Sequence, residues 1–310
     1  MIAPTGQQYS LTRHTPFGEA RATVAQVAAS LREFSIGGVD LTQPYPEDSV
    51  PPFGCGIVLV PWPNRIEDGL WSLDGQPQQL DLTEPARNNA IHGLLRNTGY
   101  DLLEQSADAV TLGAVVFPQH GYPFHLETTV RYALVDDGIE VTHWLRNLSD
   151  RRAPVAVGTH PFLTIGNTPA EDLVLTIHAS THFEVDARLN PIREHPVDGM
   201  QYDLRAGRRL GDLDLDDAFG ALVPVDGVSA RLTAPDGREV RLRQDENHPY
   251  VQVFTTREFP TASGPSLAVA IEPMTANANA FNTGEHLRWL EPGEEWSVGW
   301  GIQYSGTPGA

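Results

Sequence analysis

The feature that most constrains the fold of this chain is a recurring alternation of apolar and polar residues, broken by short turn sequences. Period-two patterns run through Leu126–Leu134, Ile139–Leu145 and Val240–Arg243, and each is typical of a strand with one buried and one wet face. Asp-Gly pairs, which favour hairpin turns, occur at residues 74–75, 137–138, 198–199, 226–227 and 236–237. Because 28 glycines and 25 prolines also interrupt long helices, the sequence predicts a nearly all-β chain.

Length and composition favour one large domain. The chain has 310 residues and 40% hydrophobic content, which is enough for a packed core. Its densest loop region, Thr42 to Pro63, is rich in proline, but apolar strands are expected on both sides of it. The many short strands favour a large antiparallel β-sandwich over a barrel. We therefore expect residues 1–310 to form a single β-sandwich domain with a groove that can hold a ring-shaped ligand.

Charge composition excludes several classes of function. Lys and Arg number 21 against 40 Asp and Glu, for a formal net charge of −19, so most of the surface should repel nucleic acid and anionic membranes. The sequence contains no lysine, and every one of those cations is an arginine. Schiff-base enzymes, pyridoxal-phosphate enzymes and phosphate-binding loops all need a lysine, so none of these mechanisms can operate here.

Cysteine use and hydropathy indicate an intracellular protein. The single cysteine, Cys55, cannot form an internal disulfide and has no base beside it in sequence, so a buried structural role is expected. No apolar run approaches the ~20 residues that span a bilayer, and the N-terminus lacks the pattern of a secretion signal. We expect a cytoplasmic protein whose oligomeric state the sequence does not indicate.

The strongest candidate for a catalytic group is Glu272. The apolar run Leu267–Ile271 stops at this acid, which is followed by Pro273 and then by several asparagines. A proline holds the preceding residue in an extended conformation, so the carboxylate should stand at the end of a buried strand. That placement suits a general base facing a polyhydroxyl substrate.

Two histidines and an arginine are further candidates. His160 follows the apolar segment Ala153–Val157, whereas the other His-Pro histidines lie among charged loop residues. His92 precedes a glycine, which permits close backbone approach to a ligand, although a turn histidine is more often structural. Arg65 should follow a strand over Ile57–Trp62 and present a guanidinium.

Nearby acids have a simpler interpretation. Arg65 alone would be expected to pair with Glu67 or Asp68, which follow it in sequence. Glu84 and Glu291, which also precede prolines, lie in polar turns and are expected to be solvated loop acids.

Taken together and in this order, these segments resemble the aldose 1-epimerase (galactose mutarotase) family over nearly the whole chain. The matching segments are Asn64-Arg65-Ile66, Asn89-x-x-His92-Gly93, Thr159-His160-Pro161-Phe162, Asp216-Asp217-Ala218-Phe219, Gln252-Val253-Phe254-Thr255 and Glu272-Pro273-Met274-Thr275. The last segment and Leu82-Thr83-Glu84-Pro85 place the chain nearer a divergent bacterial branch. The substrate therefore stays open among free hexoses and phosphorylated, sulfated or deoxy sugars.

The resemblance implies a β-sandwich that interconverts the α and β anomers of a free aldose without a metal or an organic cofactor. By the same resemblance Glu272 is the general base and His160 the general acid. The residues implied to bind the sugar are Arg65, His92, Asp216, Asn89 and Gln252, with Asp217 as the alternative to Asp216. Trp62 is open between stacking on the sugar ring and packing in the core.

The chemistry of anomer exchange is consistent with these roles. Opening a hemiacetal requires a base at the C1 hydroxyl and an acid at the ring oxygen. Rotation about C1–C2 of the open aldehyde, followed by reclosure, then gives the other anomer.

Other readings of the same residues are possible. Two carboxylates, Glu272 and Asp216, across a sugar would also describe a glycoside hydrolase, although a histidine at the acid position argues against it. A non-catalytic carbohydrate-binding sandwich would use the same polar residues. A zinc site at His178 and His182 is not favoured, because no third ligand has a recognised spacing and strand histidines are commonly solvent-facing.

Overall fold

The computed structural model describes residues 3–306, and most of these residues lie in antiparallel strands. The larger of the two main sheets has nine strands. In sheet order they are β10 (Asp101–Gln105), β11 (Ala109–Val116), β12 (Leu126–Val135), β13 (Gly138–Asn147), β27 (Glu295–Ser305), β23 (Glu239–Gln244), β22 (Val228–Thr233), β17 (Val174–Ile177) and β20 (Arg208–Arg209). This sheet contains all three of the period-two segments found in the sequence.

The second main sheet has eight strands and carries the motif segments that contain Asp216, Gln252 and Glu272. Its order is β19 (Pro191–Pro196), β18 (Ala179–Val185), β21 (Asp216–Leu222), β24 (Tyr250–Thr261), β25 (Gly264–Met274), β15 (Gly158–Thr159) and β5 (Val58–Leu59), with β16 (Phe162–Leu163) also paired to β25. The expected strand over Ile57–Trp62 is reduced to β5, because Pro61 and Pro63 cannot donate ladder hydrogen bonds.

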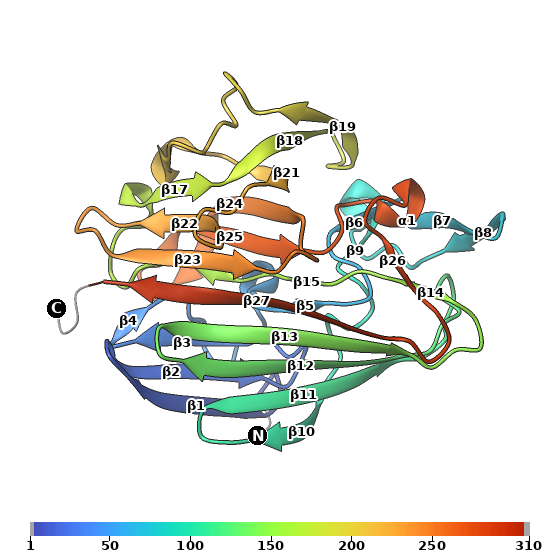
Figure 1. Ribbon diagram of the computed structural model, residues 1–310, viewed down its shortest axis with the longest axis horizontal. Coiled ribbons are helices and arrows are strands. Elements are labelled where there is room, and N and C mark those ends of the chain that lie inside the picture. Colours follow the sequence, from blue (N-terminus) through green and yellow to red (C-terminus); the bar gives the residue numbers. More distant parts are fainter. Residues whose placement is uncertain (1–2, 307–310) are drawn as a thin grey trace.

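Smaller sheets complete the molecule. A four-stranded sheet contains β1 (Gln8–Thr15), β2 (Gly18–Ala25), β3 (Leu31–Ile36) and β4 (Val39–Asp40). Three two-stranded sheets pair β6 (Arg65–Glu67) with β9 (Asn89–Ile91), β7 (Leu70–Leu73) with β8 (Gln76–Gln79), and β14 (Ala153–Val155) with β26 (Arg288–Leu290). These pairs and the short helix α1 (Ala280–Thr283) gather at one end of the molecule (Figure 1).

Helical structure is minor, as the sequence predicts. Besides α1, the described residues contain only 3-10 turns at Pro52–Gly54, Pro85–Arg87, Ala170–Asp172 and Leu210–Asp212. The Asp74-Gly75 pair closes the β7–β8 hairpin with both residues at positive φ (51° and 78°), the type I′ geometry that this dipeptide favours. Asp137-Gly138 likewise lies at the connection of β12 to β13.

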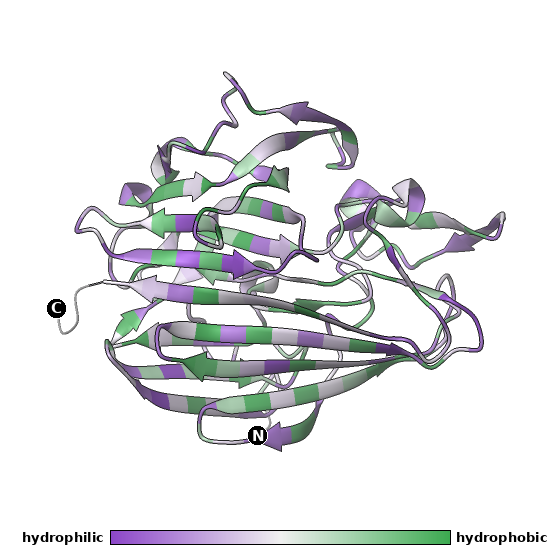
Figure 2. Ribbon diagram, viewed as in Figure 1, coloured by the Kyte–Doolittle hydropathy of each residue, from purple (hydrophilic) through white to green (hydrophobic). Residues whose placement is uncertain are grey.

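The main core lies between sheets and draws on all three larger ones. Val130 on β12, Val251 on β24 and Phe34 on β3 belong to the same buried apolar cluster. Figure 2 shows the alternation of hydrophobic and hydrophilic residues along β12 and β13 that allows one face to be buried. Cys55 is buried in a smaller cluster, as expected, and burial raises the pKa of its thiol to about 12.

Strand alternation also directs the polar residues of the eight-stranded sheet. On β25, Leu267, Val269 and Ile271 point into the main core. Their neighbours Ala268 and Ala270, and therefore Glu272, point to the opposite face. The prediction that Glu272 stands near the end of a buried strand is confirmed, since β25 ends at Met274.

Candidate functional site

A cavity of about 380 Å³ lies over the outward face of the eight-stranded sheet. We call it the site cavity. Its lining residues are Phe53, Asn64, Arg65, Glu84, Arg87, Ile91, His92, His160, Asp216, Gln252, Phe254 and Glu272. Three of the six sequence motifs that contribute here come from strands β21, β24 and β25 of that sheet. The remaining motifs enter from β6, from the loop after β9, and from the connection between β15 and β16.

Glu272 and His160 form the innermost pair of the site. His160 Nε2 lies 3.3 Å from Glu272 Oε1, and the residues expose only 5% and 2% of their surface. Glu272 Oε2 and His160 Nδ1 are buried and have no hydrogen-bond partner among the described residues. Buried polar atoms normally have a partner, so the pair carries two unsatisfied polar atoms.

Burial controls the protonation of this pair. It raises the pKa of Glu272 well above its usual 4.5, with the nearby Asp216 charge adding to the effect, and it lowers the pKa of His160 to about 4. Both shifts disfavour charge, because a low-dielectric site penalises the ionised form of either group. The pair therefore shares one proton across the pH range between these two titrations.

His92 packs against His160. The two rings meet edge to face with their centroids 5.4 Å apart, and burial lowers the pKa of His92 well below 6.5. The sequence suggested that Gly93 permits close approach of the backbone to a ligand, and the structure shows a close approach to another segment of the chain. A Cβ on Gly93 would lie 2.1 Å from the carbonyl oxygen of Val60, so this glycine is required for the loop to pack on its own chain.

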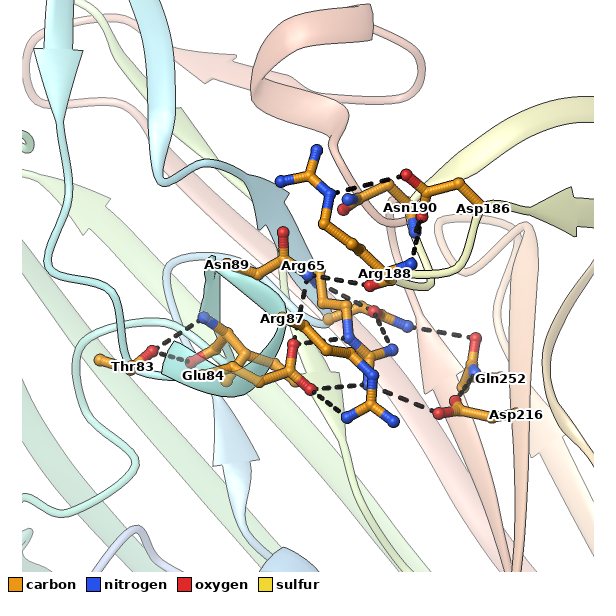
Figure 3. A network of polar contacts seen from close by, with 12 residues as sticks. Arg65, Thr83, Glu84, Arg87, Asn89, Asp186, Arg188, Asn190, Asp216 and Gln252 are labelled. Atoms are coloured by element: carbon orange, nitrogen blue, oxygen red, sulfur yellow. Dashed lines mark hydrogen bonds and ion pairs between the residues drawn. The ribbon is translucent and has the colours of Figure 1, made fainter.

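Arg65 is held by two carboxylates, neither of which is the sequence neighbour expected to pair with it (Figure 3). Its Nε and Nη2 donate to Glu84 at 2.9 and 3.1 Å, and Nη2 also reaches Asp216 Oδ2 at 3.4 Å. Burial alone would lower the pKa of Arg65, but these partners outweigh it and raise the pKa. Glu67 and Asp68 are instead bound by Arg188.

The expectation for Glu84 is wrong. It was expected to be a solvated loop acid, but its side chain is only 14% exposed and its carboxylate pairs with both Arg65 and Arg87. Because Glu84 lies 19 residues after Arg65 in another segment, no local sequence signal linked them. The Leu82–Pro85 segment of the family motif was the available clue.

Strand alternation places the side chains of Asp216 and Asp217 on opposite faces of β21. Asp216 Oδ1 accepts a hydrogen bond from Gln252 Nε2 at 2.7 Å, and Gln252 Oε1 accepts one from Asn64 Nδ2 at 3.1 Å. Asp217 is on the other face of β21, where it accepts a 2.7 Å hydrogen bond from His182 Nε2. Of the two aspartates, only Asp216 lines the site cavity.

His182 corrects a second expectation. It was expected to face solvent, but it is 3% exposed and its ring stacks on Tyr202 with centroids 3.6 Å apart. No group of three or more potential metal-ligating His, Cys, Asp or Glu side chains is found within residues 3–306. Likewise, no helix in that range is long and apolar enough to cross a membrane.

The other candidates lie at different depths. Asn89 is fully buried behind the cavity wall, where its Nδ2 donates to Glu84 Oε2 at 3.3 Å and to the Arg188 carbonyl at 3.0 Å. Trp62 packs in the core against Phe281 and Tyr122 rather than lining the cavity. Two other aromatic side chains, Phe53 and Phe254, line the cavity instead, and the sequence argument did not single them out as sugar contacts.

This geometry supports proton transfer to and from a polyhydroxyl ring. A carboxyl and an imidazole lie side by side at the bottom of the cavity, both with unpartnered atoms. Around them are an arginine, an aspartate and amide groups held in position by their mutual hydrogen bonds. Aromatic side chains at the rim offer apolar surface to the faces of a sugar.

Comparisons with known proteins show which family the chain resembles. The family model described as Aldose 1-epimerase matches residues 15–303. A protein of Escherichia coli K12 called uncharacterized protein YihR is 32% identical over 292 residues, which cover 94% of this chain and 91% of that protein.

Solved structures share the fold at low sequence identity. A GalM/aldose epimerase homologue from C. elegans superposes with a TM-score of 0.83 at 17% identity, covering 96% of this chain and 99% of the other. The galactose 1-epimerase of Lactobacillus acidophilus NCFM superposes with a TM-score of 0.76 at 20% identity, covering 96% and 98%. Both solved structures therefore have the same overall fold as this chain.

Proposed function

The chain belongs to the aldose 1-epimerase family, and from that premise we propose that it interconverts the α and β anomers of an aldohexose. The observation that carries the proposal is the adjacency of Glu272 and His160, 3.3 Å apart at the bottom of the site cavity. The C1 hydroxyl oxygen and the ring oxygen of a pyranose are both bonded to C1. A base and an acid that lie side by side can therefore reach the two oxygens at once.

In this proposal Glu272 takes the proton of the C1 hydroxyl while His160 gives a proton to the ring oxygen. The C1–O5 bond breaks and an aldehyde forms. Rotation about C1–C2 presents the other carbonyl face, and the same groups return the protons with their roles reversed. Because burial favours the uncharged forms of both groups, the proton arrangement after ring opening is the one that the site stabilises.

The surrounding residues are proposed to hold the sugar. Arg65, Asp216 and Gln252 form one hydrogen-bonded wall, and His92 packs edge to face against His160. We propose that these four bind hydroxyl or ring oxygens directly. Asn89 supports that wall through its hydrogen bond to Glu84. A location in the cytoplasm, where free aldoses are metabolised, is part of the same proposal.

The test is anomer exchange followed by NMR on equilibrium mixtures of glucose and of galactose. We expect wild-type protein to accelerate exchange, and Glu272→Gln and His160→Gln each to lower the rate by about 10²- to 10⁴-fold. The double variant should be no worse than the poorer single variant, because the two groups act as a unit. Glu140→Gln, at an exposed position of β13, makes the same chemical change away from the site and should retain the wild-type rate.

Two results would contradict the proposal. Wild-type exchange that survives Glu272→Gln in a folded protein would remove the base from the mechanism. Binding of hexoses in a calorimetric titration without accelerated exchange of any sugar would instead support a carbohydrate-binding module.

A further inference from the structure

A second cavity opens beside the site cavity, and we call it the side cavity. It has a volume of about 630 Å³ and shares Phe53, Glu84, Ile91 and His92 with the site cavity. Its other lining residues include Thr83 and Arg96. A ligand in the site cavity therefore has room to extend past His92.

Arg96 is the one arginine of the side cavity, and it has no carboxylate partner within salt-bridge distance in the described part of the chain. Its Nη2 donates a long hydrogen bond, 3.4 Å, to the Thr83 carbonyl. By contrast, Arg65 and Arg87 are both paired with Glu84. Burial lowers the pKa of Arg96 by more than the charge of nearby Glu84 raises it, whereas the carboxylate partners of Arg65 raise the pKa of Arg65 overall.

The loop that carries Arg96 is fixed in place. The backbone N–H of His92 donates to the Asn64 carbonyl, and those of Leu94 and Leu95 both donate to the Val60 carbonyl. Arg96 follows directly, so its guanidinium is a positioned cation and not a side chain on a free surface loop. In a chain of net charge −19, an unpaired, half-buried arginine beside the site favours an anionic ligand group.

The order of groups along the cavity floor indicates which part of a sugar reaches the side cavity. This step rests on the proposed function, in which Glu272 acts at C1 and His160 at the ring oxygen. His92 lies beyond His160 and lines both cavities. In a pyranose the ring oxygen is followed by C5, which carries the exocyclic C6. A group on C6 is therefore directed past His92 toward Arg96.

We propose that the preferred substrates are aldohexoses with an anionic group on C6, and that Arg96 binds this group in the side cavity. A phosphate, a sulfate or a carboxylate at C6 would each provide acceptor oxygens for the guanidinium. A neutral hexose fits the site cavity but leaves Arg96 without a partner.

The experiment compares anomer exchange of glucose, glucose 6-phosphate, glucose 6-sulfate and glucuronate at pH 7, each corrected for the enzyme-free rate. We expect kcat/KM to be higher for at least one anionic sugar than for glucose by about 10- to 100-fold, the range for hydrogen bonds to a charged group. The sugar with the largest advantage identifies the anion. In Arg96→Gln most of that advantage should disappear, and Arg96→Lys should keep part of it.

Arg131→Gln is the matched control, because it removes one exposed arginine on β12, in the nine-stranded sheet, and should leave the ratio of anionic to neutral sugar unchanged. Added NaCl should weaken use of the anionic sugar more than use of glucose. Equal kcat/KM for neutral and anionic sugars, or a ratio unaffected by Arg96→Gln, would overturn the proposal while leaving epimerase activity intact.

A binding measurement separates this proposal from the proposed function. Glu272→Gln is titrated in a calorimeter with glucose, glucose 6-phosphate, glucose 6-sulfate and glucuronate. The sugar that carries the recognised anion should bind more tightly than glucose. Adding Arg96→Gln to this variant should remove the difference in affinity. If wild type exchanges no sugar but this difference is present, the anion site stands and the epimerase proposal fails. If no anionic sugar binds more tightly than glucose, the anion site fails.

Discussion

Replacing Glu272 by glutamine should make the folded protein more stable at neutral pH while it removes the proposed base. Glu272 is 2% exposed, and burial raises its pKa well above the usual 4.5. In the unfolded chain the same carboxyl ionises freely. As pH rises above 4.5 the unfolded state therefore loses this proton first, and the stability of the folded state declines until the folded-state pKa is reached. Glutamine has no proton to lose and escapes this decline.

The stability difference between wild type and Glu272→Gln at pH 7 has an upper bound. Holding one proton on a carboxyl costs about 1.36 kcal/mol for each pH unit above its unfolded pKa. Between the usual value of 4.5 and pH 7, the wild-type protein can therefore lose at most about 3.4 kcal/mol relative to the glutamine variant. His160 has the opposite dependence, since a pKa lowered to about 4 loses stability as pH falls, but it is present in both proteins and contributes little to the difference.

The assay is urea unfolding of wild type and Glu272→Gln at several pH values from 4.5 to 7, followed by tryptophan fluorescence. We expect the difference in unfolding free energy to grow with pH in favour of the variant, by about 1–3 kcal/mol at pH 7. Glu140→Gln, at an exposed site, should show no comparable trend. A difference that stays constant with pH, or a variant less stable than wild type at pH 7, would refute the argument from burial.

Three further outcomes follow from the geometry. Exchange needs one proton on the Glu272–His160 pair, and burial lowers the pKa of His160 to about 4. Anomer exchange measured by NMR should therefore stay near its neutral rate at pH 5 and fall near pH 4, where a second proton binds; a decline centred at 6.5 would contradict this. Arg65→Met leaves two partly buried carboxylates without their cation and should lower the free energy of unfolding in urea by about 3 kcal/mol. Arg21→Met breaks an exposed ion pair and should lower it by about 1 kcal/mol or less; equal losses in the two variants would contradict the burial argument. Gly93→Ala places its Cβ 2.1 Å from a backbone carbonyl oxygen and should destabilise the fold by more than about 3 kcal/mol. The matched Gly75→Ala, also at positive φ but with nothing within 4 Å, should cost about 1 kcal/mol; similar melting temperatures for the two variants would contradict the packing argument.

The strand pattern of this chain was predictable because period-two alternation reports directly which face of a strand is buried. The segments Leu126–Leu134 and Ile139–Leu145 lie within β12 and β13, and the acid after Leu267–Ile271 lies in β25 with its side chain on the face away from the main core. The same rule separates Asp216 from Asp217, although the sequence alone did not show which of the two faces the core.

Contacts between distant segments were not predictable in this way. The partner of Arg65 is Glu84, which follows an intervening hairpin, while the acids beside Arg65 in sequence pair with Arg188. His182 was expected to face solvent because the sequence does not show that its side chain meets Asp217, which lies 35 residues further along the chain. Arg96 attracted no attention in the sequence, since only the packed structure reveals that it lacks a carboxylate partner among residues 3–306.

The hydrogen bond from Asn64 to Gln252 joins residues 188 positions apart, and the ion pair from Arg65 to Asp216 joins residues 151 apart. Contacts this remote form late, because a long loop must close before they contribute any stability. A growing chain cannot contain the site until the strand bearing Glu272 has left the ribosome.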